Sequence, residues 1–331
     1  MEQVRNIFNI RGSPSLKLAE SRAKISILNE TCKSALSQLM SYWKDYTRPA
    51  LMSLACEAVG GDPTLTQEVG SSMILLAAGI DIHDDIIDRS KKKDYGKTVL
   101  GVRGVEITLL LGDILLVKGL TSMAYDLCDR GLSAESVKAA LTLVEGLLLE
   151  LSDAETGELG LRGCMDVSPR SYLRLTRMKA ADIEAYMRIG AILGRGSSPE
   201  IEALARYGRA LGMIIILRDD LVDMLDFEEE LPHRIKYEHL PLPLLYALEN
   251  PAAKKKLESM LRNSKIREDE AKDILKITYE AGGLVGYEKA VKRLVRECLR
   301  EIRVLRPSEA RSTLEIIAEI TAPPPLANLE F

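Results

Sequence analysis

The chain has 331 residues, of which 46% are hydrophobic, and its formal net charge is −4 with acidic and basic residues interspersed. This composition supplies a large hydrophobic core, and the lack of a basic face argues against a general nucleic-acid-binding protein. No apolar stretch reaches the roughly 20 residues that a membrane-spanning helix needs, and the first residues lack the apolar core of a signal peptide. Five cysteines without C-x-x-C spacing fit a reducing compartment. We therefore expect a cytoplasmic protein without a membrane anchor.

Apolar residues recur at helical spacing along most of the chain. In chain order this pattern predicts helices over residues 16–43, 66–88, 103–128, 134–158, 169–194, 199–226, 240–262, 267–281, 285–304 and 308–321. No stretch shows the alternation of a strand beside a turn pair. The sequence therefore predicts an all-α protein built as a large helical bundle. Because no linker or repeat divides the chain, we expect a single domain over residues 1–331, with its core at about 15–322.

A cluster of aspartates ends the predicted helix 66–88, in the sequence DIHDDIID. At about 100° per residue, Asp84, Asp85 and Asp88 fall within one arc of roughly 100°, and Asp81 lies inside the same arc. A solvated acidic face would also explain one such cluster. However, all four carboxylates emerge on one side of an otherwise apolar helix.

The same spacing recurs later, in the sequence LRDDLVDMLD. Asp219, Asp220 and Asp223 have the relative angles of the first cluster and also follow an apolar helix. Carboxylates held this close raise one another's pKa or require a cation. Hard oxygen ligands favour Mg²⁺ or Ca²⁺, and Mg²⁺ is typically shared with substrate phosphates. The two clusters therefore predict Mg²⁺ ions that are shared with a diphosphate.

A diphosphate also needs fixed positive charges. Lys91, Lys92 and Lys93 follow the first cluster at once, and Lys179 lies in the sequence MKAADIEAY. A solvated loop is the favoured interpretation of Lys91 and Lys92. For Lys93 and Lys179 we favour contact with phosphate, mainly because of the resemblance described next.

Several segments together resemble the trans-isoprenyl diphosphate synthase (polyprenyl synthase) family. They occur in the family's order over roughly residues 40–322, and they are YTRPALMSLACEAVGGD, IHDDIIDRSKKKDYGKTVLG, LLLGDILL, MKAADIEAY, YGRALGMIIILRDDLVD and LRPSEARSTLEIIAEI. As a set, these motifs are highly specific for the fold. The resemblance implies an isoprenoid-synthase-type bundle of about ten or more helices around a central cavity.

The resemblance also implies a reaction. About three Mg²⁺ ions bridge the two aspartate clusters to an allylic diphosphate, which ionises, and isopentenyl diphosphate then attacks the allylic cation. Carried over, the metal-binding and catalytic residues are Asp84, Asp85, Asp88, Asp219, Asp220 and Asp223. Lys93 and Lys179 would bind the allylic diphosphate, and Arg48 would bind isopentenyl diphosphate. The family associates through helices near the first motif, so we expect a homodimer, or a heterodimer with another prenyl synthase.

The chain departs from the family where isopentenyl diphosphate should bind. The family's G-K-R-x-R-P is KDYTRP here, so the lysine becomes Asp45 and only Arg48 is kept. The paired arginines after the first motif become Lys93 and Asp94. A reversed charge beside this anion should weaken binding by several kcal/mol. The donor site is thus kept, whereas the acceptor site is altered.

Three functions remain open. The first is a prenyltransferase that binds isopentenyl diphosphate through a rearranged pocket, with charge from Lys44, Lys91, Lys92, Lys97 or Arg103. The second is an enzyme that ionises allylic diphosphates but uses another acceptor, water or the substrate's own double bond. The third is a non-catalytic or regulatory subunit of a hetero-oligomeric synthase. We favour the first.

Two further expectations concern the first helix. In the family, the residues four and five positions before the first aspartate form the floor of the chain-length pocket, and here they are Ile80 and Gly79. Small side chains there predict geranylgeranyl or longer products, and Gly79→Phe should shorten them. Asp81 could be an extra metal ligand, a polar group at the tunnel mouth, or simply a water-bridged carboxylate.

Overall fold

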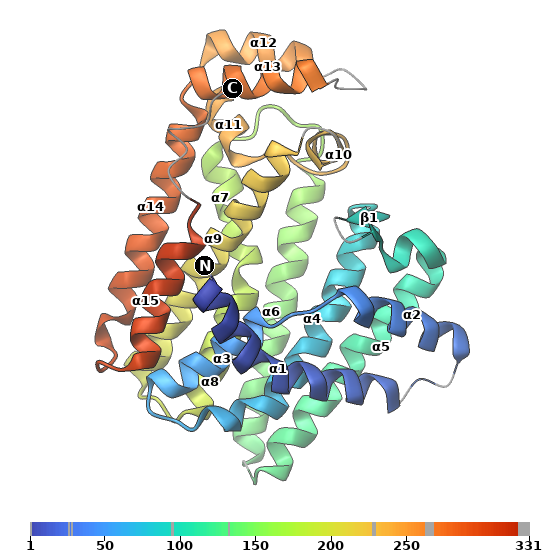
Figure 1. Ribbon diagram of the computed structural model, residues 1–331, viewed down its shortest axis with the longest axis vertical. Coiled ribbons are helices and arrows are strands. Elements are labelled where there is room, and N and C mark those ends of the chain that lie inside the picture. Colours follow the sequence, from blue (N-terminus) through green and yellow to red (C-terminus); the bar gives the residue numbers. More distant parts are fainter. Residues whose placement is uncertain are drawn as a thin grey trace. The chain divides into compact units, whose positions relative to one another are not determined.

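The computed structural model describes residues 2–25, 27, 29–93, 96–131, 133–226, 230–261 and 268–323. Within these residues the chain forms fifteen α-helices, two short 3-10 helices and one two-stranded ribbon (Figure 1). The prediction of an all-α protein is confirmed. The chain divides into two compact units: unit 1 contains residues 1–146, 185–205 and 304–313, and unit 2 contains residues 147–184, 206–303 and 314–331. The single domain over residues 1–331 stays a prediction.

The core of unit 1 is built by helices from the first part of the chain. They are α1 (Glu2–Ile25), α2 (Glu30–Tyr42), α3 (Thr47–Ala58), α4 (Gln67–Ile87) and α5 (Val99–Asp129). α4 packs mainly against α5, and α1 packs against both α3 and α4. Residues 69–79 of α4 are buried throughout, which explains their unbroken apolar and small side chains. The core thereby fixes α4, whose last turns carry the first aspartate cluster.

Caps decide where these helices begin. The Asn29 side chain accepts hydrogen bonds from the backbone N–H groups of Thr31 and Cys32, so α2 starts as a new helix after α1. The prediction of one helix over 16–43 was therefore wrong, and the N-terminal half of α1 was missed. The Thr98 side chain caps α5 by accepting from the N–H of Gly101.

A short ribbon follows the acidic end of α4. Strands β1 (Lys92–Lys93) and β2 (Gly96–Lys97) pair antiparallel, with Lys92 opposite Lys97 and Lys93 opposite Gly96. Two-residue strands are too short to show alternation, so no sequence pattern predicts them. The predicted helices also omitted the 3-10 helix η1 (Pro63–Thr66). α8 (Ala181–Leu193) supplies unit 1 with its residues from 185 onward.

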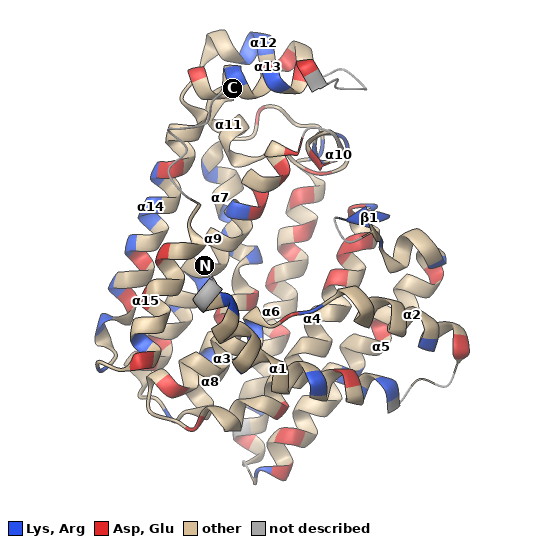
Figure 2. Ribbon diagram, viewed as in Figure 1, with Lys and Arg blue, Asp and Glu red and all other residues tan. Residues whose placement is uncertain are grey.

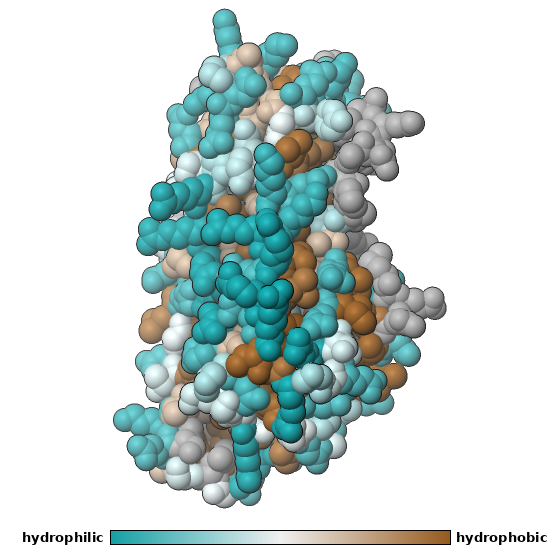
Figure 3. Space-filling view, turned by 90° about the vertical axis from the view of Figure 1, so that its left-hand side faces the viewer, coloured by the Kyte–Doolittle hydropathy of each residue, from teal (hydrophilic) through white to brown (hydrophobic). Residues whose placement is uncertain are grey.

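Unit 2 takes most of the later helices. They are α6 (Ala134–Leu159), α7 (Pro169–Lys179), α9 (Ser198–Leu225), α10 (Glu230–Tyr237), α11 (Leu242–Leu248), α12 (Pro251–Leu261), α13 (Glu268–Glu280), α14 (Gly283–Glu301), η2 (Ile302–Val304) and α15 (Glu309–Thr321), of which α6, α9, η2 and α15 are shared with unit 1. α11 packs against α7, α12, α13 and α14. α14 buries one stripe that includes Leu284, Tyr287 and Val291. Figure 3 shows one face of the molecule, which is mostly hydrophilic with smaller hydrophobic patches.

Two predicted helices of this region are each broken in two. The predicted helix 169–194 ends at Lys179 and restarts at Ala181, because Ala180 leaves helical geometry with ψ near 1°. The predicted helix 240–262 splits into α11 and α12 at Asn250, which precedes Pro251. The pattern also missed α10, and in unit 1 it missed α3. Among the described residues, no helix is long and apolar enough to cross a membrane.

Candidate functional site

The first aspartate cluster lies at the C-terminal end of α4, beside the lysine ribbon (Figure 2). The Asp85 side chain is only 5% exposed, and Lys93 Nζ lies 2.6 Å from its Oδ1. Burial raises the pKa of Asp85, and the charges of Asp81 and Asp88 raise it further, which together outweigh the lowering effect of Lys93. The structure thus places Asp85 and Lys93 together, while Asp94 lies outside the described residues.

Asp81 has a partner that the sequence did not indicate. The indole Nε1 of Trp43 donates to Asp81 Oδ2 at 2.7 Å. Trp43 is the only tryptophan of the chain and lies just after α2. The contact ties the segment before α3 to α4 and gives Asp81 a structural role.

Three of the cations suggested for the isopentenyl diphosphate site form contacts within unit 1. Arg48 Nη1 lies 3.1 Å from Asp45 Oδ2, and the Arg48 backbone N–H donates to Asp45 Oδ1. Lys44 forms an ion pair with Glu20. Arg103 Nη2 donates to the hydroxyl of Ser34 at 2.7 Å. Asp45 therefore pairs with the arginine that was predicted to bind isopentenyl diphosphate.

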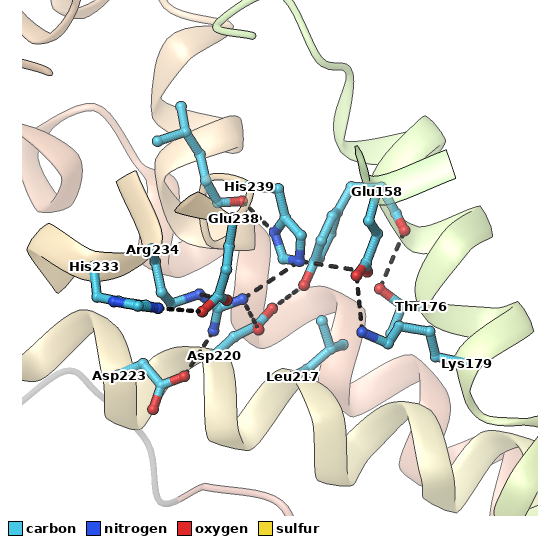
Figure 4. Close-up of polar contacts among 12 residues, drawn as sticks. Glu158, Thr176, Lys179, Leu217, Asp220, Asp223, His233, Arg234, Glu238 and His239 are labelled. Carbon is cyan, nitrogen blue, oxygen red and sulfur yellow. Dashed lines mark hydrogen bonds and ion pairs between the residues drawn. The ribbon is translucent and has the colours of Figure 1, made fainter. Parts of the chain in front are cut away.

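The second cluster ends α9 and is neutralised from within unit 2 (Figure 4). Asp220 is buried and accepts a hydrogen bond from the Tyr172 hydroxyl through Oδ2. Arg234 Nη2 lies 2.7 Å from Asp220 Oδ1, and Arg234 Nη1 donates to Asp223 Oδ2 at 2.9 Å. Asp219 differs from both, because its side chain is 58% exposed and lies 3.1 Å from Arg218 Nη2.

Arg234 is the functional candidate that sequence reasoning missed. It lies on α10, and only 4% of the residue is exposed. Burial alone would lower its pKa, but the charges of Asp220 and Glu238 raise the pKa of Arg234 well above its ordinary value. Arg234 lowers the pKa of Asp223, yet burial together with the neighbouring acids raises that pKa to about 6. The sequence pattern did not predict α10, and a single arginine there has no regular spacing that would relate it to the aspartates of α9.

Lys179 joins the same network from the end of α7. Its Nζ lies 2.9 Å from Glu155 Oε1 and 2.8 Å from Glu158 Oε2, both on α6. His239 Nε2 lies 3.4 Å from Glu158 Oε1. Burial alone would raise the pKa of Glu158, but the His239 hydrogen bond and the Lys179 charge lower it to about 2. The predicted phosphate-binding lysine is therefore balanced by two glutamates.

Among the described residues, no group of three or more His, Cys, Asp or Glu side chains is arranged to hold a metal ion. The first cluster nevertheless has suitable chemistry, because it offers only oxygen donors and a carboxylate, Asp85, whose raised pKa a cation would lower. The second cluster does not fit a three-aspartate metal site. Both oxygens of Asp220 are engaged, and Asp223 is bound by Arg234.

Gly79 and Ile80 lie in the buried part of α4. Gly79 faces α5, where an added Cβ would lie 2.9 Å from Leu116 Cγ and 3.0 Å from the Gly112 carbonyl oxygen. Ile80 is half-buried. The small residue at 79 thus permits close packing of α4 on α5, and a phenylalanine would not fit there without displacing α5.

Comparisons with known proteins agree with one another. The polyprenyl synthetase family model matches residues 29–278. A short chain isoprenyl diphosphate synthase of Methanothermobacter thermautotrophicus is 31% identical, over 92% of this chain and 94% of its own. Heptaprenyl diphosphate synthase component 2 of Bacillus subtilis is 25% identical, over 72% of this chain and 67% of its own. The crystal structure of a polyprenyl synthetase from Streptomyces coelicolor has the same fold, with a TM-score of 0.85 at 20% identity over 96% of this chain and 99% of that one.

Proposed function

The chain belongs to the polyprenyl synthetase family and is a prenyltransferase of the isoprenyl diphosphate synthase kind, and we propose that it uses Mg²⁺ to extend an allylic diphosphate with isopentenyl diphosphate. The observation that carries the proposal is the acidic end of α4, where a buried aspartate with a raised pKa meets Lys93. Such a site offers carboxylate oxygens that can bind a divalent cation and a lysine ammonium that can bind a phosphate oxygen.

In the proposed reaction the allylic C1–O bond breaks, and the double bond of isopentenyl diphosphate forms a new bond to C1. A proton then leaves, so each cycle releases pyrophosphate and H⁺. Asp84, Asp85, Asp88 and Asp219 would hold Mg²⁺, which when bound neutralises the diphosphate and assists its departure.

The chain's own cations would then bind and orient the substrates. Lys93 would leave Asp85 and bind a phosphate oxygen of the allylic substrate. Lys179 would likewise leave its two glutamates and bind a phosphate oxygen of that substrate. Arg48 would bind isopentenyl diphosphate. Fixing both diphosphates would bring the two reacting carbons together, which can contribute much of the rate enhancement.

We assign a product of geranylgeranyl length or longer. The supporting observation is that no aromatic residue occurs in α4 over residues 67–87, the helix that carries Gly79 and Ile80. An aromatic side chain beside a growing prenyl chain would shorten the available space. Because Gly79 packs against α5, Ile80→Phe is the better test, and it should shift products toward shorter chains without disturbing α5.

The oligomer proposed for this enzyme is a homodimer formed through α5. The backbone of α5 leaves helical geometry at Gly104, where φ is 78°. Large apolar side chains are exposed on both sides of this kink: Val102 before it, and Val105, Leu109, Leu110, Val117 and Tyr125 after it. Exposed apolar side chains grouped on one element typically mark an interaction surface. A second copy of the chain offers the same surface in return.

One observation favours a second candidate function, in which the allylic cation passes to another acceptor, to water or to its own double bond. The observation is the Asp45–Arg48 pair, because Asp45 adds a negative charge beside the arginine that we propose binds isopentenyl diphosphate. The relative named component 2 of a heptaprenyl synthase supports a third possibility, a subunit that needs a companion chain.

The deciding experiment uses the purified chain with Mg²⁺ and farnesyl or geranylgeranyl diphosphate, with and without radiolabelled isopentenyl diphosphate. We expect label in a longer prenyl chain, and we expect Asp84→Asn and Asp88→Asn each to lower the rate about 10²- to 10³-fold. Pyrophosphate release without incorporated label would contradict the proposal and support another acceptor. The absence of both label incorporation and pyrophosphate release would also contradict the proposal. If activity then returned on adding a companion synthase, the chain would be a subunit of a hetero-oligomeric enzyme.

A further inference from the structure

A buried arginine joins two of the three aspartates of the second cluster. Arg234 comes from α10, whereas Asp220 and Asp223 come from α9, and the guanidinium uses a different nitrogen for each carboxylate. Those nitrogens lie 2.7 Å from Asp220 Oδ1 and 2.9 Å from Asp223 Oδ2. Two carboxylates joined through one cation are the arrangement that a bridging metal ion would otherwise provide.

Neighbouring groups hold the arginine in this position. Its Nε lies 3.3 Å from Glu238 Oε2, one turn further along the chain, and Nη2 lies 3.5 Å from His239 Nε2. Tyr172 donates to the remaining oxygen of Asp220. The guanidinium is therefore surrounded on several sides. It cannot move away without leaving the buried carboxylate of Asp220 without a cation, which is strongly unfavourable.

We propose that Arg234 is a built-in cation that takes the place of one divalent metal ion at the second aspartate cluster. The inference rests on the proposed function, because it concerns how this prenyltransferase neutralises its diphosphate site. Asp220 and Asp223 are then bound to Arg234 permanently. Asp219 is the most exposed of the three aspartates on α9. Arg218, itself 44% exposed, contacts its Oδ1, so an ion can still approach the other oxygen of Asp219.

The arrangement changes how the site responds to metal. A guanidinium stays charged at all working pH values and does not dissociate when metal is scarce. The second cluster therefore keeps its geometry without any ion, and the protein needs fewer ions than two complete aspartate clusters would bind.

The test counts Mn²⁺ ions bound to the full-length protein by electron paramagnetic resonance, with inorganic pyrophosphate present. Asp223→Asn should leave the number of bound ions and their affinity unchanged within about twofold, because Arg234 already occupies this carboxylate. Arg234→Gln should bind one ion more than the wild type. Saturating Mn²⁺ should also raise its melting temperature more than that of the wild type, because the ion replaces the lost charge.

A matched control is Arg209→Gln. Arg209 also lies on α9 and joins two carboxylates, at 2.6 Å from Glu150 and 2.5 Å from Glu184, but outside the cluster. This variant should gain no ion, because its two glutamates lie outside the cluster and would share no Mn²⁺ ion with the added pyrophosphate. The proposal is overturned if Asp223→Asn loses an ion, or if Arg234→Gln gains no more ions than Arg209→Gln does.

The two proposals can fail separately. A wild-type protein that binds no Mn²⁺ even with pyrophosphate would contradict the metal dependence in the proposed function. The role of Arg234 is then decided by whether Arg234→Gln acquires an ion that the wild type lacks. If that variant does not fold, the Asp223→Asn count decides.

Discussion

At the scale of single residues, the three cations that we assign to diphosphate binding each lie against a carboxylate of their own unit. Lys93 contacts Asp85, Arg48 contacts Asp45, and Lys179 contacts two glutamates of α6. In the proposed reaction, a phosphate oxygen would replace a carboxylate oxygen at each position. Substrate affinity would then depend on the strength of each of these ion pairs, which substitutions of the acids can measure.

The first prediction concerns the Asp45–Arg48 pair. Asp45→Asn keeps an oxygen that can accept the hydrogen bond from the Arg48 backbone, but it removes the negative charge 3.1 Å from the guanidinium. We expect KM for isopentenyl diphosphate to fall about three- to tenfold, because the repulsion at a partly exposed site is of that order. KM for the allylic substrate should stay the same, and an unchanged KM for both substrates would show that Arg48 does not bind the acceptor.

The second prediction concerns Glu158, whose pKa is lowered from 4.5 to about 2 by His239 and Lys179 despite its burial. The folded state favours the ionised form, so this group stabilises the protein above pH 4.5 and the stabilisation is lost as pH falls through about 2. Glu158→Gln should lower the free energy of unfolding by about 3 kcal/mol at pH 7.

Urea unfolding at pH 7, 5, 4 and 3 checks the direction of this effect. The difference between wild type and Glu158→Gln should be constant from pH 7 to 5 and should shrink below pH 4.5. A difference that stays constant down to pH 3 would mean that the carboxylate charge is not what stabilises the network.

At the scale of elements, the packing of α4 on α5 sets the position of the first aspartate cluster. Gly79 permits this contact, since an added Cβ would lie 2.9 Å from Leu116 and 3.0 Å from the Gly112 carbonyl. Every residue that follows on α4, including Asp84 and Asp85, depends on the position that this contact sets. A larger side chain at 79 therefore acts on the whole helix.

The third prediction tests this contact. Gly79→Ala should lower the free energy of unfolding by about 1–3 kcal/mol, because overpacking outweighs the gain in helix propensity. Gly146→Ala in α6 is the control, since an added Cβ there meets nothing within 4 Å. The control should stabilise the protein by about 0.5–1 kcal/mol. If both variants stabilise it, the α4–α5 contact is looser than the structure shows.

The elements also show what the sequence could and could not predict. Long apolar helices such as α4 and α9 were predicted within two residues, because their periodicity comes from their own burial. Breaks that depend on one cap or one residue, at Asn29 and Ala180, were missed. The aspartate clusters were visible because spacing within one helix defines them. Their partners Arg234 and Trp43 were not, because tertiary packing alone brings them together with Asp220 and Asp81.

At the scale of the whole molecule, oligomerisation depends on the exposed surface of the chain and not on contacts within its core. α5 exposes 60% of Val117 and 69% of Tyr125, although it is one of the two most closely packed helices of unit 1. A helix with one face in the core and a second apolar face outside is typical of a subunit interface. The proposed homodimer would cover this second face.

The last prediction is that replacing Leu110 and Val117 together with glutamate converts the dimer to a monomer. These residues lie seven positions apart on α5 and so share one side of the helix, where four like charges would meet in a symmetric dimer. Light scattering coupled to gel filtration should show the mass of two chains for the wild type and of one for the variant. Val285→Glu on α14, a similarly exposed valine outside α5, should leave the proposed dimer intact.

If the wild type is monomeric alone but forms a complex through α5 with a companion synthase, the partner is a different chain. If the charged variant stays dimeric, the interface lies on another surface.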